Sequence, residues 1–113
     1  MTKQIAKQRQ LEPAKKFDAN KARYDLLPAK ALDEVVKIYT FGSLKYGDHN
    51  WRKGLIWSRV FGALMRHAWA FWRGEDRDKE SGHLHLAHAT WCCLTLIEYY
   101  HIHRKLDDRV KNE

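Results

Sequence analysis

The sequence predicts an all-α protein, a small bundle of three long helices preceded by an N-terminal segment. Three stretches carry apolar residues at the 3.6-residue spacing of a helix, and short polar loops with glycines separate them. Strand-like alternation of apolar and polar residues is absent from the sequence. With 113 residues the chain is long enough for one domain with a modest core.

We expect three parts along the chain. Residues 1–20 are polar and lysine-rich, which predicts a basic, flexible arm. Residues 21–106 form the single all-α domain, and residues 107–113 form a tail. The sequence has no run of about 18 apolar residues, so we do not expect a membrane helix. Met1–Arg9 lacks the apolar core of a signal peptide.

The first helix is expected from Pro28 to about Lys45, after an extended lead-in over residues 21–28. Its periodic apolar residues are Leu32, Val35, Val36 and Tyr39. A loop bounded by Gly47 and Gly54 follows. The second helix is expected to start at Trp57 or at Ser58, a candidate N-cap, and to end before Gly74.

The third helix is expected from Ser81 or Gly82 to about Leu106. Residues 89–97 in its middle are apolar almost all round, which predicts burial on every side. So small a bundle cannot bury such a helix alone, and we therefore predict a homo-oligomer. Cys92 and Cys93 lie in this stretch and are interpreted as reduced core residues of a cytoplasmic protein.

Residues 73–88 combine carboxylates and imidazoles, which bind divalent metals or move protons near neutral pH. His85 and His88 are three apart on a helix, so they share a face and are suited to hold one metal or one phosphate. The alternative for His88 is a structural role in the core, with its hydrogen bonds made inside the protein. His85, nearer the helix start, is expected to be the more exposed, and His83 points elsewhere.

The carboxylates of the same segment predict an oxygen-rich site for Mg²⁺ or Mn²⁺. Glu75 and Asp78 have Glu-x-x-Asp spacing, with Asp76 and Glu80 close by. The alternative is a solvated loop, in which Glu80 and Ser81 serve the N-terminus of the third helix.

A net charge of +7 favours an anionic partner. Lysines and arginines near the glycine-bounded loop are suited to hold phosphates, and Tyr46 and Trp51 in that loop are suited to stack on a base. His67 falls on the inward face of the second helix, where it is able to approach His88. The predicted nucleotide-binding residues are Lys21, Arg23, Lys45, Tyr46, Asn50, Trp51, Arg66 and His67.

A series of short motifs runs from Lys21 to about Tyr99. They are Lys-x-Arg-Tyr-Asp-Leu-Leu-Pro at 21–28, Thr-Phe-Gly at 40–42, Lys-Tyr-Gly at 45–47, Asn-Trp at 50–51, Trp-Ser-Arg at 57–59, Ala-Leu-Met-Arg-His at 63–67, Trp-Arg-Gly-Glu at 72–75, Asp78, Glu-Ser-Gly at 80–82 and His-Leu-Ala-His-Ala at 85–89. Their order resembles the phage dATP/dGTP diphosphohydrolase N-terminal domain family, which is distantly similar to the all-α, MazG-like nucleoside triphosphate pyrophosphohydrolases.

The resemblance implies a protein that handles purine deoxynucleotides in the host cytoplasm. MazG-like enzymes cleave between the α- and β-phosphates, with magnesium held by Glu-Glu-x-x-Glu on one helix and Glu-x-x-Asp opening a later one. Here the first pattern is reduced to Asp33-Glu34-Val35-Val36-Lys37, and His85-x-x-His88 stands where the later one would fall. This departure predicts either a different site with histidine ligands, or nucleotide binding without cleavage.

The predicted function is therefore metal-dependent hydrolysis of dATP or dGTP to the monophosphate and pyrophosphate, with Mg²⁺ or Mn²⁺. The candidate catalytic residues are Glu75, Asp78, His85 and His88. The candidate metal ligands are Glu34, Glu75, Asp78, Glu80, His85 and His88. A non-catalytic protein that sequesters a nucleotide or nucleotide signal is the first alternative. A nucleic-acid-binding protein, argued from charge alone, is the second.

Overall fold

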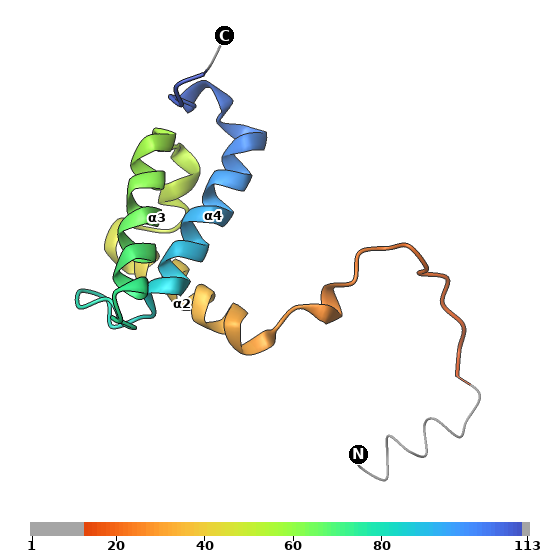
Figure 1. The fold of residues 1–113 in the computed structure, drawn as a ribbon. Helices are drawn as coiled ribbons and strands as arrows, with labels where there is room; N and C mark the ends of the chain where they lie inside the picture. The colour runs from red at the N-terminus through yellow and green to blue at the C-terminus, as the bar shows by residue number, and fades with distance from the viewer. Residues whose placement is uncertain (1–12, 112–113) are drawn as a thin grey trace.

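Three α-helices make up the body of the protein in a computed structural model that describes residues 13–111 (Figure 1). They are α2 (Ala29–Tyr46), α3 (Trp57–Trp72) and α4 (His85–Ile102). Within residues 13–111 there is no strand, only an isolated antiparallel bridge between Arg77 and Leu84. The all-α prediction is confirmed. Residues 1–12 of the predicted arm and 112–113 of the predicted tail lie outside the described residues.

Short 3₁₀ turns accompany the helices. The first, η1 (Tyr24–Leu26), lies in the lead-in, where an extended chain was expected. The second, η2 (Asn50–Lys53), lies in the loop between α2 and α3, and the third, η3 (Arg104–Leu106), follows α4. The predicted end of the third helix was therefore a few residues too late, because α4 stops at Ile102 and the chain tightens into η3.

The predicted start of the third helix at Ser81 or Gly82 was also wrong. The N-cap of α4 is Leu84, and no side chain caps it. The chain before it forms a tight turn instead, because the Asp78 amide donates to the His83 carbonyl and the Gly82 amide donates to the Asp78 carbonyl. Gly82 accommodates the turn with a φ of +74°, a conformation that glycine adopts without steric cost.

α3 and α4 run antiparallel and form the core between them (Figure 1). The indole N–H of Trp57, at the start of α3, donates to the carbonyl of His103, just past the end of α4. Tyr99 is completely buried, and its hydroxyl donates to the Trp51 carbonyl and accepts the Leu55 amide hydrogen. Val60 and Cys92 complete this buried cluster.

Within the single chain, α4 is buried on one face only. One face packs inward through Ala89, Cys92 and Thr95, but Ile97 on the opposite face is 59% exposed. Cys93 is exposed as well, so only one of the two cysteines belongs to the core. The predicted homo-oligomer stays a prediction. Across the described residues, no helix is both long and apolar enough to span a membrane.

α2 packs mainly against α4. Val35 and Ile38 are its buried residues, and the Tyr39 ring lies 6.2 Å from the rings of both Trp51 and Trp91. This contact holds the C-terminal half of α2 and the η2 loop around one side of the α3–α4 pair, where a cavity opens.

Candidate functional site

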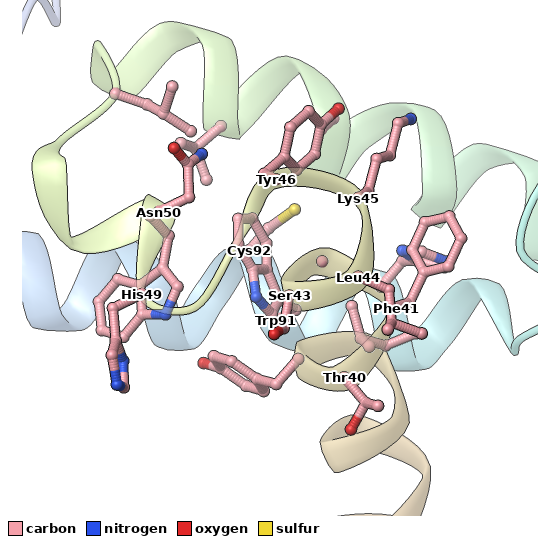
Figure 2. A pocket seen from close by; sticks show the side chains of 18 of the residues that line it. Thr40, Phe41, Ser43, Leu44, Lys45, Tyr46, His49, Asn50, Trp91 and Cys92 are labelled. Carbon is pink, nitrogen blue, oxygen red and sulfur yellow. The ribbon is translucent and has the colours of Figure 1, made fainter.

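A cavity of about 850 Å³ lies between the C-terminal half of α2, the η2 loop and the facing sides of α3 and α4 (Figure 2). Its volume is within the range of small-molecule sites. Three cationic side chains line it, together with several aromatic rings. These residues are Lys45, Arg59 and Arg66, with Tyr39, Phe41, Tyr46, Trp51 and Trp91.

Six of the eight predicted nucleotide-binding residues line this cavity: Lys45, Tyr46, Asn50, Trp51, Arg66 and His67. Lys21 and Arg23 are not among its lining residues. They lie in the N-terminal segment that leads away from the helices (Figure 1), and Arg23 forms an ion pair with Asp25 at 2.7 Å.

The aromatic rings of the cavity differ in how closely they pack against other side chains of the protein. The Trp51 ring has the Arg52 guanidinium 4.6 Å from its centre and the Tyr99 ring 6.5 Å away, so it is part of the packing around the core. Trp91, which was not among the predicted nucleotide-binding residues, also lines the cavity. It lies in the apolar middle of α4, where the sequence cannot distinguish a cavity residue from a core residue.

The loop between α3 and α4 delivers a carboxylate to the start of α4. The bridge between Arg77 and Leu84 closes this loop, and Asp78 begins its tight turn. The Asp78 carboxylate accepts the backbone N–H of Ser81 at 2.8 Å. Burial alone would raise the pKa of Asp78, but the hydrogen bonds from Ser81 and the nearby His88 and His67 rings together keep this pKa below its usual value.

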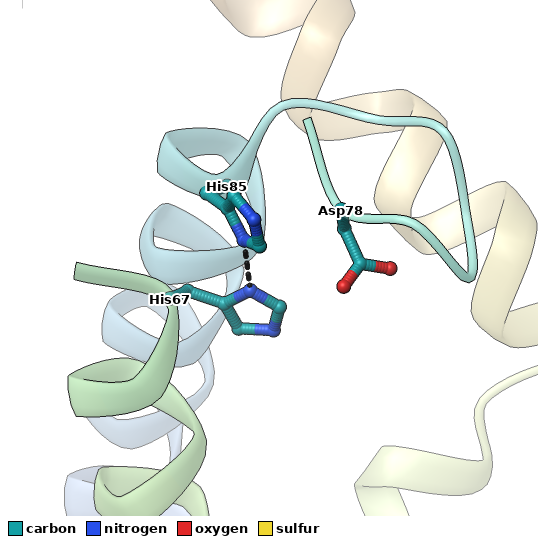
Figure 3. Close-up of side chains that lie close together, drawn as sticks. All are labelled: His67, Asp78 and His85. Atoms are coloured by element: carbon teal, nitrogen blue, oxygen red, sulfur yellow. Dashed lines mark hydrogen bonds between the residues drawn. The ribbon is translucent and has the colours of Figure 1, made fainter. Parts of the chain in front are cut away.

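His67, Asp78 and His85 form a cluster at this point (Figure 3). One donor atom from each lies within 4.8 Å of the other two, and Nδ1 of His67 is 2.9 Å from Nδ1 of His85. His85 is only 5% exposed, although its position near the helix start predicted it to be the more exposed of the two histidines. The expectation failed because the loop folds back over the start of α4.

Glu75 fixes the orientation of the His85 ring. Its carboxylate lies 3.1 Å from Nε2 of His85, and because an ionised carboxylate can only accept, Nε2 carries the proton. A neutral His85 therefore has its lone pair on Nδ1, which faces His67.

His88 has a different partner. Its Nε2 lies 2.7 Å from the Ser81 hydroxyl oxygen, which also accepts the backbone N–H of His83. Ser81 is thus bound to His88 and does not cap the helix. Burial and the neighbouring His67 lower the pKa of His88 to about 4, so it is neutral at pH 7.

The three imidazoles are packed against one another. The rings of His67 and His88 are stacked, with centres 4.4 Å apart and planes 6° from parallel. Burial and the neighbouring His85 lower the pKa of His67 as well. The lowered pKa values favour the neutral forms of His67 and His88 beside an ionised Asp78. A neutral imidazole and a carboxylate are the forms that bind metals, whereas a neutral ring offers no charge to a phosphate.

The remaining predicted metal ligands lie elsewhere. Glu34 pairs with Lys37 on α2 at 3.1 Å, and its second oxygen, Oε2, is buried without a hydrogen-bond partner among the described residues. Glu80 is exposed and forms an ion pair with Lys45, which ties the loop to the end of α2. Of the predicted set, the structure therefore gathers Glu75, Asp78, His85 and His88, and adds His67.

The sequence predicts that His67 lies on an inward face, but it does not identify His67 as a metal donor. Periodicity shows that a side chain points inward, but it does not show which residue of another helix it meets. The contact with His85 depends on the register between α3 and α4.

Comparison with known proteins supplies a family. The family model described as "dATP/dGTP diphosphohydrolase, N-terminal" matches residues 11–109. A relative named "dATP/dGTP diphosphohydrolase" from Salmonella phage PMBT28 is 38% identical over 74 residues, which cover 66% of this chain and 25% of the relative. The matching region thus spans a quarter of that protein's length. No solved structure matches the chain.

Proposed function

The chain belongs to the dATP/dGTP diphosphohydrolase N-terminal family, and from that premise we propose that it hydrolyses dATP or dGTP to the monophosphate and pyrophosphate with a divalent metal ion, Mg²⁺ or Mn²⁺. One observation supports this proposal most. His67 lines the cationic, aromatic cavity and is also one of the three residues of the histidine–carboxylate cluster. A nucleotide in the cavity would therefore have its phosphates beside the cluster.

The cavity has the groups that a nucleotide requires. Aromatic rings offer stacking surface for a purine base, and the carboxamide of Asn50 offers both a hydrogen-bond donor and an acceptor. Lys45 and Arg66 line the same cavity as His67 and would neutralise charge on the phosphates. Arg59 is a third cation for this role.

The cluster has donors that fit a divalent ion, since it combines imidazole nitrogens with the ionised Asp78 carboxylate. Such an ion, when bound, polarises phosphoryl oxygens and lowers the pKa of a bound water. In the hydrolysis, a water oxygen bonds to the α-phosphorus and the bond to the bridging oxygen breaks. Pyrophosphate leaves, and the displaced proton passes to solvent.

A nucleotide panel tests the proposal. The protein is incubated with dATP, dGTP, the pyrimidine deoxynucleotides and the ribonucleotides, each with Mg²⁺ or Mn²⁺, and the products are separated by anion-exchange chromatography. We expect monophosphate and pyrophosphate in equal amounts from dATP or dGTP, and none with EDTA. Nucleotide that binds in EDTA and returns unaltered under all conditions would support sequestration and refute hydrolysis.

A pair of arginine variants, one on α3 and one at its C-cap, links the reaction to the cavity. Arg66→Gln removes a cation from the cavity lining, and we expect it to raise KM roughly tenfold, the equivalent of one charge-assisted hydrogen bond. Arg73→Gln is the matched control, because Arg73 is not among the lining residues. Equal effects of both changes would show that the reaction does not use the cavity.

We also propose that the chain self-associates. Phe61, Trp69 and Trp72 on α3 are 54%, 54% and 76% exposed, and such large apolar side chains are commonly covered by a partner. Light scattering coupled to size-exclusion chromatography is expected to give a mass above the monomer, and Trp72→Gln to lower it. A monomer at all concentrations would contradict this proposal.

A further inference from the structure

We propose that His67, Asp78 and His85 bind a first-row transition-metal ion in preference to Mg²⁺. This inference rests on the proposed function only in that it identifies the ion of the same site. The proposed ligands are two imidazole nitrogens and one carboxylate oxygen, in place of the oxygen-rich ligand set expected from the sequence. His67 of α3 is one of them.

The placement of the three donors is the first argument. They come from α3, the loop after it and the first turn of α4, yet one donor atom of each lies within 4.8 Å of the others. The two Nδ1 atoms are 2.9 Å apart, and the carboxylate of Asp78 lies beside them (Figure 3).

The chemistry of the donors is the second argument. Mg²⁺ prefers oxygen ligands in a near-ideal octahedron, usually carboxylates, phosphates and water. Imidazole suits Zn²⁺, Fe²⁺ and similar ions, and two histidines with one carboxylate are a common set for them. The carboxylates that would make an oxygen-rich site are placed elsewhere, since Glu34 pairs with Lys37 and Glu80 with Lys45.

The surroundings of the donors are the third and independent argument. Histidines that bind metals usually donate their other ring N–H to a carboxylate, which fixes the ring and raises its basicity. Glu75 accepts the Nε2 proton of His85 at 3.1 Å and so leaves the Nδ1 lone pair facing Nδ1 of His67, whose proton a bound ion would replace. The Ser81 amide holds the Asp78 carboxylate in the same way. Glu75 is thus a positioning residue and not a ligand.

Metal binding without nucleotide tests this inference. The whole chain is stripped with EDTA, then dialysed against Mn²⁺, Co²⁺ or Zn²⁺ at micromolar concentration in the presence of millimolar Mg²⁺. Bound metal is measured by mass spectrometry, and the visible spectrum of the Co²⁺ form reports its ligands. We expect one transition-metal ion per chain despite the excess of Mg²⁺.

Matched variants identify the ligands. We expect His67→Gln, Asp78→Asn and His85→Gln each to abolish stoichiometric binding and the Co²⁺ spectrum. Asp76→Asn and His101→Gln keep both, because Asp76 contributes only its backbone carbonyl to His85 and His101 is exposed. Glu75→Gln is expected to keep the stoichiometry with an affinity about 10–100-fold lower. Circular dichroism of each variant confirms that it is folded.

Several outcomes would overturn the inference. They are a protein that binds no transition metal, one in which Mg²⁺ competes at equal concentration, and one whose metal binding survives all three ligand changes. Because no nucleotide is present, these results are independent of hydrolysis. Mg²⁺-dependent hydrolysis by a chain that binds no transition metal would refute this inference and leave the proposed function standing.

Discussion

The two ends of the antiparallel α3–α4 pair are built in different ways. At one end, Trp57, Val60 and Tyr99 pack into an apolar core. At the other end, His67 and His85 face each other across the same pair of helices. One end is held together mainly by buried apolar surface, and the other by hydrogen bonds among ionisable side chains.

The difference lies in what each end does with its polar atoms. At the core end, the Tyr99 hydroxyl is fully used by the Trp51 carbonyl and the Leu55 amide. At the site end, the rings of His67 and His88 line the cavity. Polar atoms that lie beside a cavity are available to a ligand, so we expect the core end to determine stability and the site end to determine activity.

The largest expected effect tests the core end. Tyr99→Ala removes a completely buried ring and leaves the Leu55 amide without its acceptor. We expect the free energy of unfolding to fall by about 3–5 kcal/mol, as measured by urea denaturation. Tyr100→Ala, the exposed neighbour, is the control and is expected to change it by about 0.5 kcal/mol or less.

The next prediction concerns the site end, where activity and stability should separate. Asp78→Asn removes the charge but keeps an oxygen that can accept the Ser81 amide. We expect hydrolysis to slow by at least about 100-fold, in keeping with the loss of one electrostatic group at a reacting centre, while the free energy of unfolding changes by about 1 kcal/mol or less. Asp76→Asn is the matched control in the same loop. A large loss of stability in Asp78→Asn would show that the two ends do not divide the roles.

Ser81→Ala tests how far the site end depends on its hydrogen bonds. The change deprives Nε2 of His88 of its hydrogen-bond partner and the His83 amide of its acceptor. We expect a loss of stability of about 1 kcal/mol and, in the ¹⁵N spectrum of the His88 ring, a shift toward a mixture of tautomers. An unchanged His88 tautomer would mean that Ser81 does not orient this ring.

The fold was predictable because it depends mainly on local patterns. The 3.6-residue spacing of Leu32, Val35, Val36 and Tyr39 predicted α2 nearly to its ends, and Trp57 and Gly74 bracket α3. The start of α4 was wrong for a physical reason. Ser81 followed by Gly82 resembles a helix start, but the hydroxyl that would cap the helix bonds to His88.

The arrangement of the site was predictable only in part. The sequence singled out the segment that carries Glu75, Asp78 and His85, since carboxylates and imidazoles rarely gather in one loop by chance. It could not pair them with His67, because that contact depends on the register of α3 against α4. It also grouped Glu34 and Glu80 with them, whereas each forms an ion pair with a lysine, a choice that sequence spacing does not determine.

The smallest expected effect is a difference in thiol reactivity between the buried and the exposed face of α4. Cys92 lies in the buried cluster, and burial raises the pKa of its thiol to about 11, whereas the neighbouring Cys93 is exposed. Because the thiolate is the reactive form, a thiol reagent at pH 8 is expected to label one cysteine per chain quickly and the second only after unfolding. Cys93→Ser should abolish the fast phase and leave the unfolding free energy within about 0.5 kcal/mol of the parent. Fast labelling of Cys92 in the folded chain would show that the α3–α4 core opens readily, and the core end would then not be the stable partner in this comparison.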